Sequence, residues 1–283
     1  MSFNVPFILF TFFTFQIFTY ANSNNQIIWF QHQRAPWMIS TGTYQNKGYG
    51  DKIRIDIEKK LPQYTHTQLE INPSRLLKQI DKHPNICYGP VGKFPMLLNK
   101  FYWSKPLYLM TGYRIIMLPK NHKKLNLLDE VSMNTLLQNK EYTFGQIAGM
   151  FHYPVDFEKY KNQQNIHTIS SSAPLTHLLR MMRRDRIDWV YDHPVFVKWE
   201  NIIENNFEEV LATLKVSENK NKPKLTAYIA CSKNEFGKKI IQTINTQVKK
   251  EDILDYRSYI RKWQLNEETL NSFEKINQDF FGY

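Results

Sequence analysis

Short apolar runs alternate with amphipathic stretches along the first part of the chain. A β-rich run at 27–30 precedes a polar loop, and at 52–61 large apolar residues recur every four positions, as on one face of a helix. Strand-like runs at 67–71 and 85–88 flank a helix that opens near 73–75 and extends through Ile80. Strands that alternate with helices in this way predict an α/β unit with a largely parallel sheet.

A second α/β unit is predicted after a β-like run at 108–118, which is long enough to cross between two lobes. A polar stretch at 219–224 is typical of a linker, and a strand at 225–231 and a helix at 237–248 follow it. We find no internal repeat. Between the crossing run and the linker we expect helices at 127–138, at 155–161 and from Pro174 onward. The buried stripe of the last helix consists of Leu175, Leu178, Leu179 and Met182. Strands are expected at 142–146, 166–169 and 187–191.

The first residues have the pattern of an export signal. Residues 6–20 are almost wholly apolar and uncharged, and Ala21-Asn22-Ser23 offers small residues where signal peptidase requires them. We expect cleavage after Ser23, which leaves a mature protein outside the cytoplasm, free in solution because the first cysteine is Cys87 and no lipid-acceptor cysteine lies near the cleavage site. An uncleaved signal anchor is the alternative, since no Lys or Arg precedes the apolar run.

Composition places the mature chain among globular proteins, because 42% of residues are hydrophobic and 14% aromatic. The formal net charge of +11 is spread along the chain, and the densest basic cluster, 180–186, is short and interrupted. This distribution, with the export signal, argues against a nucleic-acid partner. An anionic ligand, an acidic membrane surface and a merely solvated basic surface all remain compatible with it.

Two cysteines, Cys87 and Cys231, both lie in apolar, strand-like runs. In an exported chain they permit one disulfide bond. Burial as two free thiols is equally compatible with the sequence, because spacing along the chain cannot bring the two α-carbons within bonding distance.

Candidate binding residues fall in loops that follow predicted strands, where the pocket of an α/β protein is expected. Trp37 offers a flat apolar wall or ordinary core packing. Gly145 to Gly149 form either a tight turn or a set of backbone N–H groups for an anion. Ser170, Ser171 and Ser172 cap the next helix or donate hydroxyls to a ligand, and Asp192 either caps a turn or receives a cationic group.

Motifs of catalysis and cofactor binding are missing from the sequence. It contains no nucleophile-elbow serine, no zinc-protease or paired-cysteine signature, no phosphate loop and no acidic metal loop. His152, His167, His177 and His193 are scattered and could meet only through tertiary folding. We therefore expect no catalytic residue, metal or cofactor.

Five stretches, taken together in order and spacing, give the chain a family resemblance. The chain resembles the family 3 extracellular (periplasmic) solute-binding proteins of the amino-acid-binding type across nearly the whole mature sequence. Within that family it looks like a branch marked by a cysteine in the strand before Gly92-Lys93-Phe94-Pro95 and by a late Cys-Ser-Lys. The stretches are Gly48-Tyr49-Gly50-Asp51-Lys52-Ile53, Gly92-Lys93-Phe94-Pro95, Tyr102-Trp103-Ser104-Lys105-Pro106, Asp185-Arg186-Ile187-Asp188 and Cys231-Ser232-Lys233.

The resemblance implies a type II periplasmic-binding-protein fold, with two α/β lobes joined by two crossing strands. Residues 24–111 and 219–283 would form lobe one, and 112–218 lobe two, after the signal peptide at 1–23. These proteins capture a small polar or amino-acid-like solute between the lobes and present it to an inner-membrane ABC permease or a sensor, and the resemblance implies a monomer.

Site residues follow from the same resemblance. The arginine that clamps a ligand carboxylate in the family matches Leu97 here, so a standard amino acid ligand is in question, with Lys93 or Arg34 as substitutes. Asp192 lies beside the position that receives the ligand ammonium. Phe151 and Tyr153 lie near the loop that usually supplies backbone and hydroxyl contacts, and Trp37 lies near the stacking aromatic; Gly149 and Ser171, named above for their loops, complete the candidate ligand-binding set.

Two other functions remain open at this stage. A periplasmic enzyme of the dehydratase or lyase type could use the same fold, and would need a poised acid or base in the cleft. An interaction module that has lost small-molecule binding is the second alternative, motivated by Leu97.

Overall fold

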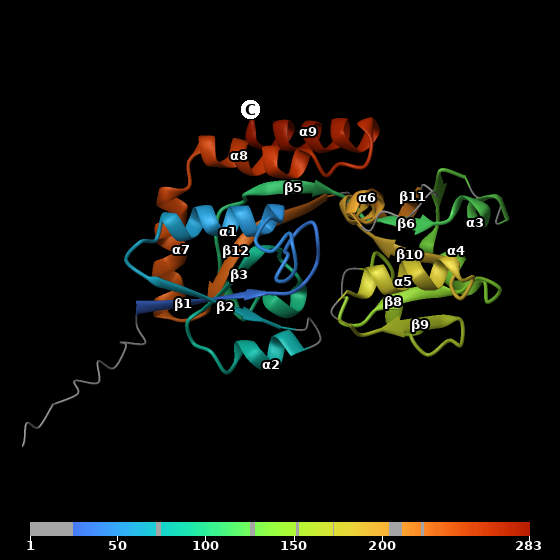
Figure 1. Cartoon of the computed structure of the whole chain (residues 1–283), viewed down its shortest axis with the longest axis horizontal. Coiled ribbons are helices and arrows are strands. Elements are labelled where there is room, and N and C mark those ends of the chain that lie inside the picture. The colour runs from blue at the N-terminus through green and yellow to red at the C-terminus, as the bar shows by residue number, and fades with distance from the viewer. Residues whose placement is uncertain are drawn as a thin grey trace, which may run out of the picture.

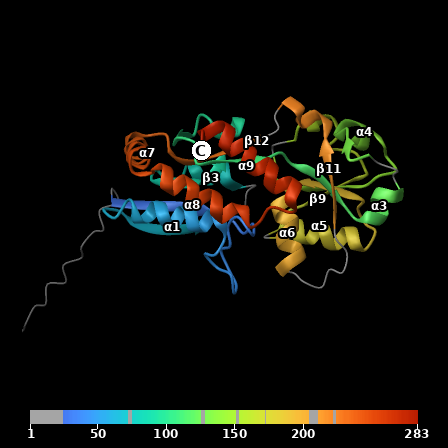
Figure 2. The same ribbon diagram turned by 90° about the horizontal axis from the view of Figure 1, so that it is seen from above.

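The computed structural model describes residues 25–71, 75–124, 128–150, 153–171, 173–203, 211–221 and 224–283. The expected signal peptide at 1–23, together with Phe151, His152 and Ser172, lies outside the described residues. Within these ranges, no helix combines the length and the apolar character needed to cross a membrane. Two α/β lobes lie side by side along the longest axis, and both views show them as separate bodies (Figures 1 and 2).

The first lobe is built on a mixed sheet. The strand β1 pairs in parallel with β2 and β3, whereas β12 returns from late in the chain and pairs antiparallel with β3, β4 and β5. Its sheet therefore draws on segments from both ends of the described chain. In spatial order its strands are β2 (Thr65–Glu70), β1 (Gln26–Gln31), β3 (Ile86–Gly92), β12 (Lys224–Ser232) and β4 (Phe101–Trp103), with β5 (Tyr108–Thr111) also on β12.

Helices cover this sheet, and α8 and α9 lie at the opposite end of the lobe from α2 (Figure 1). In α1 the residues Ile53 and Ile57 are fully buried, as their four-residue spacing predicts. The first-lobe helices are α1 (Tyr49–Lys59), α2 (Leu76–Ile80), the 3₁₀ turn Pro95–Leu97, α7 (Glu235–Gln247), α8 (Lys250–Arg261) and α9 (Glu267–Phe281).

The second lobe carries a six-stranded sheet with strand order β7-β11-β6-β10-β8-β9. The predicted stripe of α5, from Leu175 to Met182, is buried against it. Its strands are β6 (Arg114–Met117), β7 (Glu130–Val131), β8 (Phe144–Ile147), β9 (Ile166–Ile169), β10 (Trp189–Asp192) and β11 (Ala212–Val216). Its helices are α3 (Pro119–Lys124), α4 (Met133–Gln138), α5 (Pro174–Arg183) and α6 (Pro194–Ile203), with 3₁₀ turns at Phe157–Lys159 and Ser217–Asn221.

Several predicted boundaries differ from the observed ones. The run at 108–118 is two strands rather than one, because β5 pairs in the first sheet, β6 pairs in the second, and residues 112–113 turn the chain between them. The helix expected at 155–161 is a short 3₁₀ turn. The helix expected at 237–248 begins earlier, at Glu235, because Asn234 accepts a hydrogen bond from the Gly237 backbone N–H.

The last helix, α9, ties the two lobes together beside the crossing. The buried Asn277 side chain accepts from the Leu109 N–H at 2.8 Å and donates to the Leu109 carbonyl at 2.9 Å. It therefore satisfies both backbone hydrogen-bonding groups of this β5 residue, as a neighbouring strand would. At the other end of α9, the Glu268 carboxylate lies 3.0 Å from Arg114 in β6 and 2.9 Å from Lys215 in β11. One helix therefore holds both connections between the lobes.

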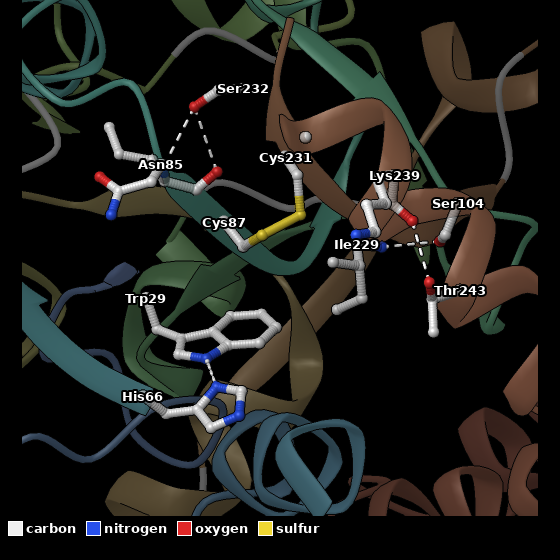
Figure 3. Close-up of a disulfide and its surroundings, with 12 residues drawn as sticks. Trp29, His66, Asn85, Cys87, Ser104, Ile229, Cys231, Ser232, Lys239 and Thr243 are labelled. Atoms are coloured by element: carbon white, nitrogen blue, oxygen red, sulfur yellow. Dashed lines mark hydrogen bonds between the residues drawn. A yellow bond between two sulfur atoms is a disulfide. The ribbon is translucent and has the colours of Figure 1, made fainter. Parts of the chain in front are cut away.

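A disulfide bond joins the central strands of the first lobe (Figure 3). Cys87 in β3 and Cys231 in β12 lie directly opposite each other, with their sulfur atoms 2.00 Å apart and both residues fully buried. Beside them, the Ser232 hydroxyl accepts from the Ile86 N–H at 3.1 Å. Of the two cysteine states that the sequence left open, the structure has the disulfide, which closes a loop of 144 residues.

Removing this bond should lower the stability of the whole protein. For the paired substitutions Cys87→Ala and Cys231→Ala, we expect a loss of about 2 to 5 kcal/mol in the free energy of unfolding, because the unfolded chain regains the freedom that a long closed loop denies it. Urea unfolding measures this, with the pair Thr246→Ala and Ser258→Ala on exposed helix faces as control. Equal unfolding midpoints for cysteine and control variants would contradict the prediction.

Candidate functional site

A cavity of about 140 Å³ lies where the two lobes face each other. From the first lobe it is lined by the loop after β1, by β3 and by the segment that follows β3. The turn after β8 and the start of α6 line it from the second lobe, and Tyr113 does so from the crossing segment. Its position at the ends of strands in both sheets is where the binding site of an open α/β protein is expected.

The loop after β1 brings Arg34 and Trp37 to this cavity. The Trp37 N–H donates to the Arg34 carbonyl at 2.9 Å, and the Arg34 N–H donates to the Met38 carbonyl at 2.9 Å, so the loop is closed into a tight turn. The beginning of α1 fixes it from below, because the Gly50 N–H donates to the Trp37 carbonyl at 2.8 Å. A Cβ atom at Gly50 would lie 2.4 Å from the indole ring, so this close packing requires glycine.

Many of the side chains that line the cavity are aromatic. The Trp37 indole meets the His32 ring edge-on with centroids 5.0 Å apart, and the Tyr88 ring at 6.2 Å. Burial raises the pKa of Tyr88 above its ordinary value, and the same holds for Tyr49 and Tyr113, so these phenols stay protonated. The wall is thus apolar with scattered neutral polar groups.

Arg34 and Asp192 form an ion pair across the cleft. The guanidinium Nη2 lies 2.6 Å from Oδ1 of Asp192, at the end of β10, and the guanidinium carbon lies 4.2 Å from the Phe196 ring centroid on α6. The Asp192 side chain is fully buried, and its Oδ1 also accepts from the His193 N–H at 2.7 Å. A cation from one lobe therefore meets a carboxylate and an aromatic face of the other.

Both partners of this pair remain charged. Burial is the largest effect and disfavours the charged guanidinium, but the Asp192 carboxylate and the neighbouring tyrosines together outweigh it and raise the pKa of Arg34 above its ordinary value. For Asp192, burial raises the pKa, while the Arg34 cation and the His193 N–H oppose that rise. Arginine does not lose its proton in proteins, so the carboxylate at 2.6 Å remains its natural counterion.

Two histidines of the cavity wall are neutral. His193 is 2% exposed, and its Nε2 donates to the Thr111 carbonyl at 2.9 Å, while its Nδ1 accepts from the Val195 N–H at 3.3 Å. A second ring proton would have to sit on Nδ1, where it would face the Val195 N–H and break this hydrogen bond. Burial, first of all, lowers the pKa of His193 to about 3, and burial together with the Arg34 charge lowers that of His32 to about 3.

The structure gathers some of the predicted site residues and separates others. Trp37, Gly149 and Leu97 line the cavity, and Asp192 lies directly behind Arg34. Lys93 is exposed, with its ammonium 4.2 Å from the Tyr228 ring centroid and outside the cavity lining.

The loop residues of the second lobe lie further out. The Ser171 hydroxyl is buried without a hydrogen-bond partner among the described residues. Tyr153 stacks on Phe157 with ring centroids 4.3 Å apart, and Phe151 lies outside the described residues. Across the described chain, no three His, Cys, Asp or Glu side chains are grouped so that they could hold a metal ion.

Sequence reasoning missed the partnership of Arg34 with Asp192, which are 158 residues apart. It also missed His32, Tyr88 and Phe196 as wall residues. One usable signal existed, because Arg34 and Trp37 share one short loop after the first strand, and a loop that carries one pocket residue tends to carry others.

The neutral state of His193 should make stability depend on pH. In the unfolded chain His193 takes up a proton below its ordinary pKa of 6.5, whereas in the folded protein its pKa is about 3. The native state therefore loses stability as the pH falls from 6.5 towards 3. We expect His193→Gln to reduce the loss by about 1.4 kcal/mol per pH unit. Urea unfolding between pH 7 and pH 4 measures this.

The exposed His167 supplies the matched control, His167→Gln, whose stability should follow the wild-type pH dependence. If the wild type and His193→Gln lose stability in parallel as the pH falls, His193 is not the buried neutral group described above.

No family model matches the chain, and no curated protein matches its sequence. Solved structures do resemble it. An amino acid ABC transporter substrate-binding protein from Streptococcus pneumoniae, bound to L-arginine, superposes with a TM-score of 0.63 at 14% identity, over 85% of this chain and 94% of that chain. A Salmonella typhimurium periplasmic binding protein of high arginine specificity gives 0.59 at 14% identity, over 84% and 99%.

A third similar structure is a substrate-binding protein of an ABC uptake transporter from Streptococcus pneumoniae with bound histidine, with a TM-score of 0.58, 15% identity and coverage of 89% and 93%. Likenesses at this identity establish architecture. The chain has the two-lobed α/β fold of periplasmic binding proteins, as its sequence predicted.

Proposed function

We propose that this protein is a solute-binding protein that encloses a small molecule between its two lobes. The observation that carries the proposal is the cavity of about 140 Å³ lined by both lobes. Its support comes from the fold, since the similar structures named above are amino acid or ABC-transporter substrate-binding proteins. A solute that contacts both walls would favour the closed arrangement over an open one.

The wall indicates what such a solute is like. Trp37, Tyr88, Phe94 and Phe196 present aromatic surface, and Leu97 adds an aliphatic side chain. Burying apolar ligand surface here would supply most of the binding free energy. An apolar cavity of about 150 Å³ holds a molecule of the size of benzene. The ligand of this protein is then a ring-sized or amino-acid-sized molecule with a substantial apolar part.

The proposal includes export and a membrane partner. Residues 6–20 and the Ala21-Asn22-Ser23 site support secretion, so the protein would act in the periplasm or at the cell surface. There the closed form would be recognised by an ABC permease or a sensor protein. Boundaries near 111 and 219 between the lobes fit this mechanism, since closure then bends only the two connections held by α9.

A ligand screen with a blocked variant tests the function. Residues 24–283 are screened by thermal shift against amino acids, amines, amides, organic acids and sugars. A true ligand at a hundredfold excess over its Kd should stabilise the wild type by about 2.7 kcal/mol. Ala148→Phe, which fills the cavity from the second lobe, should abolish the shift.

His167→Phe, an exposed position on the neighbouring strand β9, is the matched control and should keep the shift. The ligand should be recovered chemically unchanged. Conversion of the ligand would favour the enzyme alternative, and a screen without any stabilising compound would favour the interaction module and refute the solute-binding function.

A further inference from the structure

The charges around the cavity balance without a ligand. Among the described residues that line it, Arg34 is the one that carries a formal charge at neutral pH, because the histidines are neutral and the tyrosines protonated. The Asp192 carboxylate, 2.6 Å away, matches that charge. The site as a whole is therefore net neutral, with the carboxylate fully buried and the guanidinium largely so.

A charged solute would have to disturb this pair. A ligand carboxylate that binds Arg34 would bring a second anion next to Asp192, and like charges placed together in an interface cost several kilocalories per mole. A ligand ammonium would have to reach Asp192, which is fully buried and lies outside the cavity lining, behind Arg34. A zwitterionic amino acid would need both exchanges at once. Each case also strips the charged ligand group of water in an apolar cavity.

The pair still leaves hydrogen-bond donors for a neutral group. Arg34 has five N–H donors, and one hydrogen bond, to Asp192, joins its side chain to the described residues. The side chain is 18% exposed and lines the cavity, while its flat face is occupied by the Phe196 ring. The free edge of the guanidinium can donate to a carbonyl or hydroxyl oxygen of a solute without a change in net charge.

We propose that the Arg34–Asp192 pair sets the charge of the ligand, so that the cavity selects an uncharged, ring-bearing solute with a hydrogen-bond acceptor directed at Arg34. The inference rests on the proposed solute-binding function and deepens it. It names Arg34 and Asp192 as specificity-determining residues, with Trp37 and Phe196 as the wall against which the ring packs.

Four probes of matched shape test the charge preference. They are phenylacetamide (neutral), phenylacetate (anion), 2-phenylethylammonium (cation) and L-phenylalanine (zwitterion), and binding to residues 24–283 is measured by titration calorimetry and tryptophan fluorescence. Wild-type protein should bind phenylacetamide about tenfold or more tightly than each charged probe. A wild type that prefers a charged probe or phenylalanine overturns the proposal.

Variants of the pair should move the preference in opposite directions. Asp192→Asn leaves Arg34 unmatched and should make phenylacetate the preferred probe, whereas Arg34→Met leaves the carboxylate unmatched and should favour 2-phenylethylammonium. The double variant Arg34→Met with Asp192→Asn restores neutrality and should prefer phenylacetamide again. If a single variant fails to fold, the double variant still tests the charge preference, because it leaves no buried charge unpaired. Folded single variants that keep the wild-type order overturn the assignment.

The ligand screen separates this inference from the function on which it rests. If the screen yields ligands that Ala148→Phe blocks and these are charged, the solute-binding function stands and the neutral preference is wrong. If the ligands from the screen are uncharged, they support both the solute-binding function and the neutral preference, even when none of the four probes binds. If no compound of the screen and none of the four probes binds, the solute-binding function itself is refuted.

Discussion

An ion pair joins the two lobes of this protein across the cleft. The Arg34 guanidinium, held on a tight loop of the first lobe, reaches the Asp192 carboxylate and the Phe196 ring of the second lobe. Because Asp192 is fully buried, either partner alone would be an uncompensated charge in an apolar region, which is costly. Burial keeps the cavity histidines neutral and the cavity tyrosines protonated, so among the described residues that line the cavity the charge comes from Arg34, and Asp192 matches it.

Architecture was within reach of the sequence, because it is determined by local periodicity. The helix stripes of α1 and α5 and the apolar runs of the parallel strands are set by neighbours a few residues away. The split of 108–118 into two strands could have been suspected from Gly112, but a lone glycine inside a strand-like run does not show that its two halves pair in different sheets. The helices α8 and α9 were missed, although their amphipathic faces were present in the sequence.

The candidate site shows the same division. Trp37, Gly149 and Asp192 could be proposed because they follow predicted strands, where loops of α/β proteins meet. The pairing of Arg34 with Asp192 depends on the relative position of two lobes, which no local pattern encodes. Lys93 illustrates the opposite case, since this lysine of the expected segment is exposed and lies over the Tyr228 ring, outside the cavity lining.

The placement of β12 affects how the chain can acquire its structure. Strands β3, β4 and β5 of the first lobe all pair with β12, which follows the entire second lobe in the sequence. As the chain is synthesised from its N-terminus, β3, β4 and β5 are therefore made while their shared partner β12 is still unavailable. The second lobe, whose strands are contiguous in sequence, can fold ahead of the first. The edge of β3 then stays unpaired until β12 and its cysteine arrive, so assembly of the first lobe is the folding step most exposed to aggregation.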